Sequence, residues 1–394
     1  MTTDDERRDR GAAGPGDRRR ARAIHAAADA RRLARRRLPW MVFDYIDGAA
    51  GTEAGARRNR AALDAFCLCP RVLRNAARRD PATTLFGSPA GRPFGIAPMG
   101  MCNLAWPGAD AALARAAARH RIPLGVSTVS STPLERMAEL AEGHAWFQLY
   151  FSGDNTTAFR LVERARAAGY ATLVLTVDVP EVGRRPRELR HGFRMPFRIG
   201  PRQFLDFALH PRWSLTTLAR GRPEMANFTR SGLVFDRTES RAAADWDTFR
   251  RLRDAWPGRL VVKGIMDPAD ALRARDGGAD AVEVSNHGAR QLDSAPALLD
   301  ALGRVRAALG PDFPVFADSG LTSGEDVLKA LVAGADFAFL GRVFLFAMAA
   351  AGAAGVERMV EVLTAELDLA MAQTGVRNPD EARAHRSALC WPPA

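Results

Sequence analysis

Hydrophobic and polar positions fall into a repeating pattern of blocks from about residue 90 of this chain onward. Short runs rich in Val, Leu, Phe and Ala alternate with longer stretches of Ala, Arg and Leu at helical spacing. Near-continuous apolar runs are typical of strands that are buried on both faces of a parallel sheet. We expect eight such strands, at 94–98, 123–128, 145–150, 172–178, 260–264, 281–286, 314–318 and 337–341.

Eight strand–helix units predict an α/β fold, a (β/α)8 TIM barrel, whose usual core of about 250 residues fits this part of the chain. We place the barrel domain at 90–394, with a long insertion after the fourth strand at about 186–245. Residues 23–89 predict an N-terminal helical cap segment. Residues 1–22, which are rich in arginine, predict a disordered basic tail.

The insertion is too long for an ordinary connection between a strand and a helix. Loops of this length usually serve as lids or as binding elements. The aromatic residues and arginines of 194–230 also suit a membrane interface. The sequence favours a lid, and a peripheral membrane contact through 194–230 is the alternative.

Composition narrows the class of protein. The 394 residues, 47% of them hydrophobic, can build one large core or two domains. The net charge of +11 comes from arginines spread along the chain, without a zinc-finger spacing or an aromatic RNA-binding signature, so we expect no nucleic-acid partner. The four cysteines show neither a metal spacing nor a disulfide pattern, which predicts no metal site.

Location is predicted from the same features. The N-terminus lacks the apolar core of a secretory signal, and we find no stretch that is long and apolar enough to span a bilayer. A cytoplasmic protein is therefore expected, with a peripheral position on the inner face of the membrane as the alternative.

Polar groups follow nearly every predicted strand, at the end of the barrel where catalytic residues of this fold lie. The segment "SNHGARQLD" (285–293) places His287 and Arg290 directly after the sixth strand. His287 can act as a general base, and Asp178, which ends the fourth strand, can hold its imidazole ring. Guanidinium groups bind carboxylates through paired hydrogen bonds, so Arg185 and Arg290 predict a binding site for a small acid.

Lysine is almost absent from the chain, which contains only Lys263 and Lys329. Oxidation of a carbon–hydrogen bond beside a carboxylate needs a redox cofactor, because no side chain accepts two electrons. Lys263 ends the fifth strand, where a compact ammonium group would stabilise negative charge on a reduced flavin. The segments "DSGLTSG" (318–324) and "GR" (341–342) follow the seventh and eighth strands, a place that commonly binds phosphate in this fold.

These motifs resemble those of the FMN-dependent α-hydroxy acid oxidoreductases, the group of glycolate oxidase, L-lactate dehydrogenase and mandelate dehydrogenase. The resemblance covers roughly residues 25 to 380, through the blocks "LPWMVFDYIDGAA", "QLY", "LTVD", "GRR", "VVKG", "SNHGARQLD" and "GR" in the family's order. It implies FMN as the cofactor and oxidation of a small (S)-2-hydroxy acid to a 2-oxo acid. The electron acceptor would be a quinone, a protein or O2. Gly100 favours a dehydrogenase over an oxidase, and a homo-oligomer is expected.

The resemblance also implies a role for each residue of the site. His287 would be the catalytic base, with Asp178 as its partner. Substrate contacts would come from Tyr45, Tyr150, Arg185 and Arg290. Flavin contacts would come from Pro98, Met99, Gly100, Ser127, Gln148, Thr176, Lys263 and Ser285. Contacts to the ribityl chain and phosphate would come from Asp318, Ser319, Gly320, Gly341 and Arg342.

Three positions depart from the family pattern. Ser319 replaces a glycine of the phosphate loop, and Thr322 stands where the family usually has an arginine. We therefore expect weaker binding of FMN. Val129 stands where glycolate oxidases often have a bulky aromatic residue, which predicts a wider pocket for the substrate side chain.

Two other functions follow from the residues. Lys263 on a barrel strand could form the Schiff base of an aldolase-type lyase. That reading leaves His287 and the two arginines without a joint role. A non-catalytic basic binding protein on the same fold is the other alternative, against which the combination of His287, Asp178 and Lys263 argues.

Overall fold

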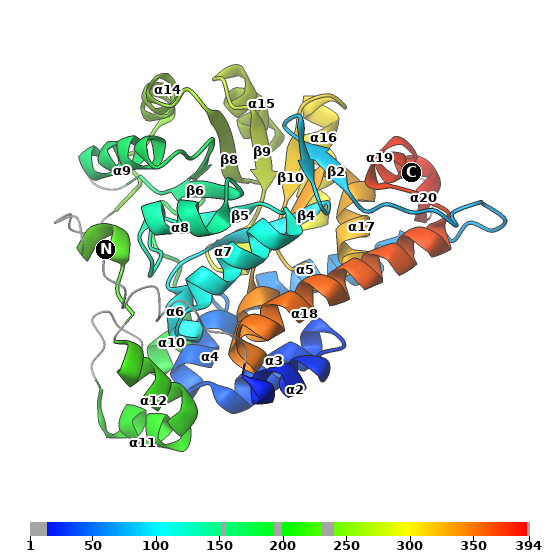
Figure 1. Cartoon of the computed structure of the whole chain (residues 1–394). Helices are drawn as coiled ribbons and strands as arrows, with labels where there is room; N and C mark the ends of the chain where they lie inside the picture. The colour runs from blue at the N-terminus through cyan, green and yellow to red at the C-terminus, as the bar shows by residue number, and fades with distance from the viewer. Residues whose placement is uncertain (1–13, 152–154, 193–198, 222, 230–239, 392–394) are drawn as a thin grey trace.

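The computed structural model describes residues 14–151, 155–192, 199–221, 223–229 and 240–391. Eight parallel strands form a closed barrel in the order β10-β11-β4-β5-β6-β7-β8-β9. This arrangement confirms the predicted TIM barrel, and each strand overlaps its predicted range (Figure 1). The strands are β4 (Phe94–Met99), β5 (Leu124–Ser127), β6 (Ala145–Leu149), β7 (Thr172–Thr176), β8 (Arg259–Ile265), β9 (Ala281–Val284), β10 (Val315–Ala317) and β11 (Phe337–Leu340).

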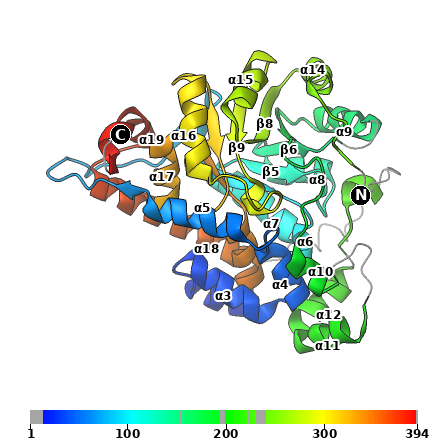
Figure 2. The same cartoon turned by 180° about the vertical axis from the view of Figure 1, so that it is seen from behind.

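Helices surround the barrel and bury its outer face, as the two opposite views show (Figures 1 and 2). This double cover explains why the strands are apolar along nearly their whole length. The surrounding helices are α7 (Ala109–His120), α8 (Leu134–Ala141), α9 (Thr156–Ala167), α14 (Trp246–Ala255), α15 (Pro268–Asp276), α16 (Leu298–Leu309), α17 (Gly324–Ala333) and α18 (Arg342–Thr374).

Aromatic side chains fill the amino-terminal end of the barrel interior. The ring centroids of Trp146 and Phe339 lie 5.4 Å apart, and those of Trp146 and Phe316 lie 6.0 Å apart. A hairpin of β2 (Thr83–Leu85) and β3 (Ser88–Ala90) brings Phe86 against Phe316. Because this end is packed with side chains, the carboxyl end of the strands is left to form the site.

The N-terminal segment forms four helices, α2 (Pro15–Arg22), α3 (Ala27–Arg37), α4 (Trp40–Asp47) and α5 (Ala54–Ala65). The last three lie within the predicted cap segment. The first corrects the prediction of a disordered tail at 1–22, because residues 15–22 are helical and pack on α18. Asp17 forms an ion pair with Arg20 and lies 3.4 Å from Arg212, so opposite charges support this segment. Residues 1–13 of the predicted tail lie outside the described residues.

Helix α18 passes the test of length and composition for a membrane span, which corrects the expectation that no stretch would do so. In the fold, however, 78% of its apolar window is buried inside the protein. The helix is kinked at Gly352, which has a φ of 60°, and it packs against α2, α3, α7 and α17. Its apolar character therefore belongs to a core helix.

The insertion after β7 contains α10 (Pro186–Arg190), α11 (Pro201–Leu209), α12 (Pro211–Arg220) and α13 (Ala226–Thr229). Helix α10 packs against α4, and the backbone N–H of Met41 points at the carboxylate of Asp206, 3.5 Å away. The pair α11–α12 extends from the main body of the molecule beside α4 and α10 (Figures 1 and 2). Two short strands, β1 (Cys67–Leu68) and β12 (Cys390–Trp391), pair near the C-terminus, which follows α19 (Pro379–Ala384) and α20 (Arg386–Leu389).

Candidate active site

A cavity of about 630 Å³ lies at the carboxyl ends of the barrel strands. Most of the residues predicted from the sequence line it, namely Tyr45, Pro98, Met99, Gly100, Ser127, Tyr150, Arg185, Lys263, His287, Arg290, Asp318, Ser319, Gly320, Gly341 and Arg342. The other four, Asp178, Gln148, Thr176 and Ser285, stand just behind this lining. Their side chains or strand neighbours contact lining residues, as described below.

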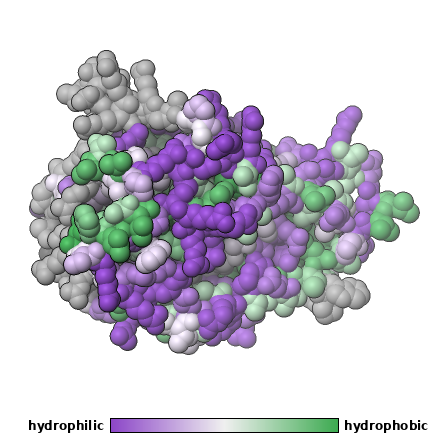
Figure 3. Space-filling view, turned by 90° about the horizontal axis from the view of Figure 1, so that it is seen from below, coloured by the Kyte–Doolittle hydropathy of each residue, from purple (hydrophilic) through white to green (hydrophobic). Residues whose placement is uncertain are grey.

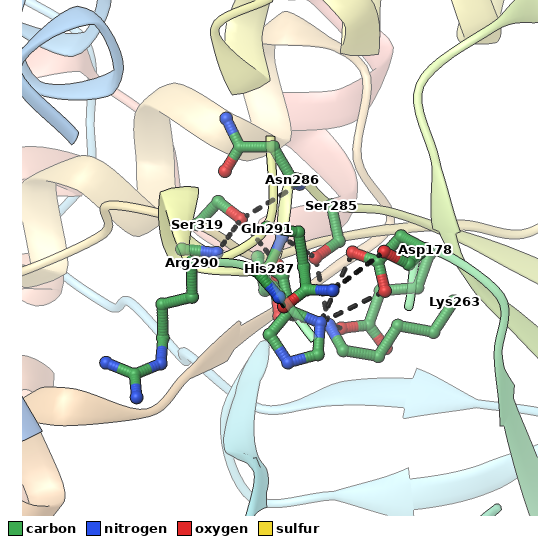
Figure 4. A network of polar contacts seen from close by, with 12 residues as sticks. Asp178, Lys263, Ser285, Asn286, His287, Arg290, Gln291 and Ser319 are labelled. Carbon is green, nitrogen blue, oxygen red and sulfur yellow. Dashed lines mark hydrogen bonds and ion pairs between the residues drawn. The ribbon is translucent and has the colours of Figure 1, made fainter. Parts of the chain in front are cut away.

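His287 and Asp178 form the predicted pair. Nδ1 of His287 lies 3.0 Å from Oδ1 of Asp178 and 3.3 Å from Oδ2 (Figure 4). A carboxylate at Nδ1 holds the proton on that nitrogen and leaves Nε2 as the basic atom. Gly264 permits the approach, because it has a φ of 102° and a Cβ there would lie 2.7 Å from the side chain of Asp178.

The loop that carries His287 is strained and firmly held. His287, Gly288 and Ala289 have φ values of 58°, 61° and 61°, in the left-handed region that residues other than glycine rarely adopt. The hydroxyl of Ser285 accepts a hydrogen bond from the backbone N–H of His287 at 2.9 Å, and Asn286 accepts one from Ala289 at 3.0 Å. Strain of this kind persists where the surrounding contacts determine the backbone, and it is frequent at functional sites.

The two predicted substrate arginines converge on one buried carboxylate. Glu188 in α10 lies with Oε1 3.3 Å from Arg185 and 3.0 Å from Arg290. Arg290 also donates to the backbone carbonyl of Gly48 at 2.6 Å, and its guanidinium lies over the ring of Tyr45. Burial lowers the pKa of Arg290, and the nearby charge of Arg342 lowers it further. The guanidinium groups are thus close enough together to bind one small acid.

Sequence reasoning missed Glu188, which pairs with both arginines, and Arg241, which lines the cavity. Glu188 could have been found as an acidic residue three positions after Arg185, at the spacing of helical ion pairs. Arg241 lines the cavity, and its guanidinium carbon lies 5.6 Å from the ring centroid of Tyr150. No motif surrounds Arg241 in the insertion, so no sequence signal indicated it.

The two predicted tyrosines line the cavity and can act as hydroxyl donors. The hydroxyl of Tyr45 donates a hydrogen bond to the backbone carbonyl of Gly100 at 3.2 Å. Tyr150 is enclosed, and burial raises its pKa well above the ordinary value, reinforced by the negative charge of Asp178. Tyr150 therefore stays protonated and can donate a hydrogen bond to an oxygen of the substrate.

Lys263 is buried and surrounded by acceptors. Its Nζ lies 2.6 Å from Oε1 of Glu283 and 3.1 Å from Oγ of Ser285, and it contacts the carboxylate of Asp318. Burial alone would lower the pKa of Lys263, but the charges of Asp318 and Glu283 raise it above the ordinary value. A Schiff-base lysine must be a neutral amine to attack a carbonyl group. The environment of Lys263 therefore opposes the aldolase alternative.

Buried polar atoms indicate where a flavin ring would bind. Within the described part of the chain, Nε2 of Gln148 and Oγ1 of Thr176 are buried without a hydrogen-bond partner. Such atoms are uncommon and usually mark a missing ligand or water. Both belong to the set predicted to contact the flavin, and Gln148 also accepts a hydrogen bond from Ser127 at 3.1 Å. An isoalloxazine ring offers carbonyl oxygens and ring nitrogens that match these groups, so the residues fit FMN.

At the predicted phosphate end, Ser319 supports the loop rather than weakening it. It has a φ of 92°, which explains why glycine suits this position. Its hydroxyl accepts hydrogen bonds from the backbone of Gly288 at 2.9 Å and of Asn286 at 3.2 Å, and donates to Asp318 at 2.8 Å. These three bonds compensate for the strained conformation.

Few positively charged side chains are available at the predicted phosphate end of the cavity. The hydroxyl of Thr322 donates to Asp326 at 3.0 Å and lies 3.3 Å from Arg60. Both terminal nitrogens of Arg60 are engaged by the carboxylate of Asp326, at 2.8 and 3.0 Å. Among the described residues, Arg342 is therefore the guanidinium that the phosphate loops contribute to this end of the cavity. Arg342 also donates to the carbonyl of Gly288.

Restoring a positive charge at position 322 should strengthen FMN binding. We expect Thr322→Arg to lower the dissociation constant of FMN by about 10- to 100-fold, because a hydrogen bond to a charged group contributes roughly 1.5 to 3 kcal/mol. Titration of the flavin-free protein with FMN, followed by quenching of flavin fluorescence, measures the change. Thr322→Met, which adds length without charge, is the matched control. An unchanged constant in the arginine variant would show that the phosphate lies elsewhere.

Comparisons with known proteins agree with this geometry. The family model described as FMN-dependent dehydrogenase matches residues 34–389. The (S)-mandelate dehydrogenase of Pseudomonas putida is 39% identical over 355 residues, which cover 88% of this chain and 89% of that protein.

Solved structures are equally similar. The crystal structure of the monotopic membrane protein (S)-mandelate dehydrogenase superposes with a TM-score of 0.86 at 38% identity, over 90% of this chain and 96% of that one. Mandelate oxidase with (S)-2-phenylpropionate superposes with a TM-score of 0.78 at 36% identity, over 91% and 96% of the two chains.

Proposed function

This chain belongs to the FMN-dependent dehydrogenase family, and we propose that it oxidises an (S)-2-hydroxy acid with a bulky apolar side chain while docked on a membrane. Its cofactor is FMN, and its reaction is the FMN-dependent oxidation of an (S)-2-hydroxy acid, in the manner of the dehydrogenases. The observation that carries the reaction is the His287–Asp178 pair beside two arginines that converge on one carboxylate. Flavin reduction by 2-hydroxy acids in the absence of oxygen is the direct test.

In the proposed mechanism, the protein binds, orients and deprotonates the substrate. Arg185 and Arg290 bind the substrate carboxylate through their guanidinium groups. Nε2 of His287 takes a proton from the substrate, and Asp178 stabilises the imidazolium that results. FMN, when bound, supplies the acceptor for the two electrons that leave the substrate carbon.

Several side chains would hold the cofactor in this mechanism. Gln148, Thr176, Ser127 and Lys263 suit the polar edge of the ring, and Arg342 suits the phosphate. Lys263 remains an ammonium, so it can stabilise negative charge on the reduced ring. These placements are proposals that rest on the donors and acceptors each residue presents to the cavity.

The residues that line the cavity favour a substrate with a bulky apolar side chain. Val129, Val179, Val182 and Met225 line it, and the guanidinium of Arg241 lies nearby over Tyr150. Apolar side chains and an arginine face suit an aromatic ring, which packs against both. The similar proteins whose names mention mandelate are in keeping with an aryl-bearing acid.

Gly100 directly follows β4 and packs closely against Val129, which lies two residues after β5. A Cβ at this position would lie 2.5 Å from Cγ2 of Val129, so even alanine would force Val129 to move. This close packing explains the glycine at this position. The assignment as a dehydrogenase is supported instead by the similarity to (S)-mandelate dehydrogenase.

Exposed apolar side chains gather on α11 and α12. Phe204, Leu205, Leu209, Leu215 and Leu218 are 60 to 81% exposed, and we call them the α11–α12 surface. In the space-filling view from below, one cluster of hydrophobic residues lies on the left, the side on which Figure 1 places α11 and α12 (Figure 3). Exposed patches of this kind mark interaction sites. Among the described residues, no member of α11 or α12 lines the cavity, whereas Met225 and Arg241 of the same insertion do. The lid expected from the sequence stays a prediction.

A membrane bilayer with anionic lipids is the occupant we propose for the α11–α12 surface. Arg202, Arg212 and Arg220 are exposed on the same two helices. Apolar anchors with basic neighbours are typical of elements that lie in the membrane interface. A neighbour of similar structure is described as a monotopic membrane protein. Docking there would give access to a lipid-soluble quinone as the electron acceptor. The cytoplasmic side of the membrane and a homo-oligomeric state remain predictions.

Replacing two apolar anchors should strongly weaken vesicle binding. We expect the double variant Phe204→Asp, Leu218→Asp to bind vesicles of mixed neutral and anionic lipids at least about 100-fold more weakly, because each buried side chain contributes roughly 1.5 to 3 kcal/mol. Cosedimentation with the vesicles measures binding, and reduction of a soluble dye by the substrate should stay unchanged. Leu73→Asp is the matched control, because Leu73 is fully exposed outside α11–α12. Equal sedimentation of the double variant and the parent protein would contradict membrane docking.

A further inference from the structure

Glu283 is a buried carboxylate that the mechanism above does not use. It lies in the apolar strand β9 and is 1% exposed. The register of the barrel pairs it with Lys263 on β8, and Lys263 is paired in turn with Thr176 on β7. The Nζ of Lys263 donates to Glu283 at 2.6 Å. Burying a carboxylate is costly, so its position beside the proposed flavin site needs a physical explanation.

Lys263 is shared between two carboxylates. Besides Glu283, it contacts Asp318, which follows β10 and also accepts a hydrogen bond from Ser319. The charge of Asp178, from the end of β7, acts on Lys263 as well. The net charge of Lys263, Glu283 and Asp318 is therefore negative when both carboxylates are ionised. It is zero when Glu283 holds a proton.

The two carboxylates differ in their affinity for a proton. Burial raises the pKa of Glu283 to about 8, and the negative charge of Asp318 also raises it, while Lys263 opposes the shift. Asp318 is also buried, but Lys263 and the hydroxyls of Ser285 and Ser319 hold its pKa below the usual range. Glu283 is therefore the member of the cluster that changes its charge near neutral pH, whereas Asp318 stays ionised.

We propose that Glu283 tunes the reduction potential of the flavin by partly neutralising Lys263, and that its own ionisation makes this tuning dependent on pH. The inference rests on the proposed placement of the flavin ring beside Lys263. An ionised Glu283 adds a negative charge 2.6 Å from Nζ and weakens the positive field that favours a reduced, anionic flavin. A protonated Glu283 leaves that field intact. Glu283 acts through Lys263 and is a positioning residue, not a catalytic one.

The proton balance follows from this coupling. Reduction brings two electrons and one proton to the flavin, and the negative charge on the reduced ring raises the proton affinity of Glu283. Between pH 8 and the higher pKa that Glu283 has in the reduced protein, reduction draws up to one additional proton from solvent onto the Glu283 carboxylate. Below pH 8 Glu283 is already protonated, and no additional proton is bound.

The reduction potential of the holoenzyme, measured from pH 6 to pH 10 with photochemical reduction and a reference dye, tests the proposal without any substrate. In the parent protein, the potential should fall more steeply with pH from about pH 8. In Glu283→Gln, which keeps the shape but cannot ionise, this steepening should be absent. The two proteins should agree at pH 6. At pH 10 the variant should have the higher potential, by at least tenfold in the equilibrium constant, or ~30 mV for a two-electron couple.

Several outcomes would overturn the proposal. A parent profile without any steepening contradicts it, even if the glutamine variant fails to fold. Identical potentials for Glu283→Gln and the parent at pH 10 contradict it as well. The variant Lys263→Met distinguishes a failure of the role of Glu283 from a failure of the proposed placement of the flavin. If it lowers the potential while Glu283→Gln changes nothing, the role of Glu283 fails alone. If neither variant shifts the potential, the flavin does not lie beside Lys263. Absence of flavin reduction by 2-hydroxy acids would instead refute the proposed reaction.

Discussion

His287→Gln is expected to slow flavin reduction by an (S)-2-hydroxy acid by about 10²- to 10⁴-fold, the usual loss when a general acid–base group is removed. Glutamine keeps a hydrogen-bonding group of similar size but cannot take the proton. The phosphate and carboxylate contacts lie on other residues, so FMN and substrate should still bind. Stopped-flow absorbance under anaerobic conditions measures the rate, and the flavin spectrum reports bound FMN.

The control for this substitution is a second histidine outside the site. His144→Gln changes a residue that does not line the cavity and should leave the rate unaffected. The contact between Nδ1 of His287 and Asp178 is the geometric basis of the expected loss. A His287→Gln protein that reduces its flavin at a near-normal rate would remove His287 as the base.

Arg290→Lys is expected to lower kcat/KM for 2-hydroxy acids by about 10- to 100-fold, because loss of a hydrogen bond to a charged partner costs roughly 1.5 to 3 kcal/mol. Lysine keeps the positive charge that balances Glu188 but loses the planar pair of donors. The flavin should remain bound. Steady-state kinetics with an acid and with its methyl ester measure how much of the loss in kcat/KM depends on the substrate carboxylate.

The ester comparison defines the role of Arg290 more sharply. An ester lacks the anion, so the parent protein should oxidise it poorly and the lysine variant should lose little further activity. Arg377→Lys is the control, because Arg377 is an exposed arginine that pairs with Glu381 away from the cavity. Equal turnover of acid and ester by the parent protein would exclude a carboxylate clamp.

The barrel and most of its site could be predicted because local pattern and global fold agree. Each strand is buried on both faces, so it appears as a nearly continuous apolar run. Parallel strands bring all their carboxyl ends to one mouth of the barrel, so polar residues such as Asp178, Lys263 and His287 meet there although they are far apart in sequence.

The features that were missed depend on contacts between distant segments. Residues 15–22 have the composition of a disordered tail, yet they fold on α18 with Asp17 paired to arginines. Glu283 stands alone in an apolar run, and only the register with β8 shows that it meets Lys263. The exposed apolar side chains of α11 and α12 depend on how these two helices pack, which periodicity alone does not determine.

The spectrum of the holoprotein mixed with 2-hydroxy acids in the absence of oxygen tests the central claim most directly. The absorbance of oxidised flavin should be lost with (S)-mandelate and more slowly with (S)-lactate, while (R)-mandelate should leave it unchanged. One equivalent of substrate should reduce one equivalent of flavin. A flavin that stays oxidised with every (S)-2-hydroxy acid offered would contradict the proposed reaction.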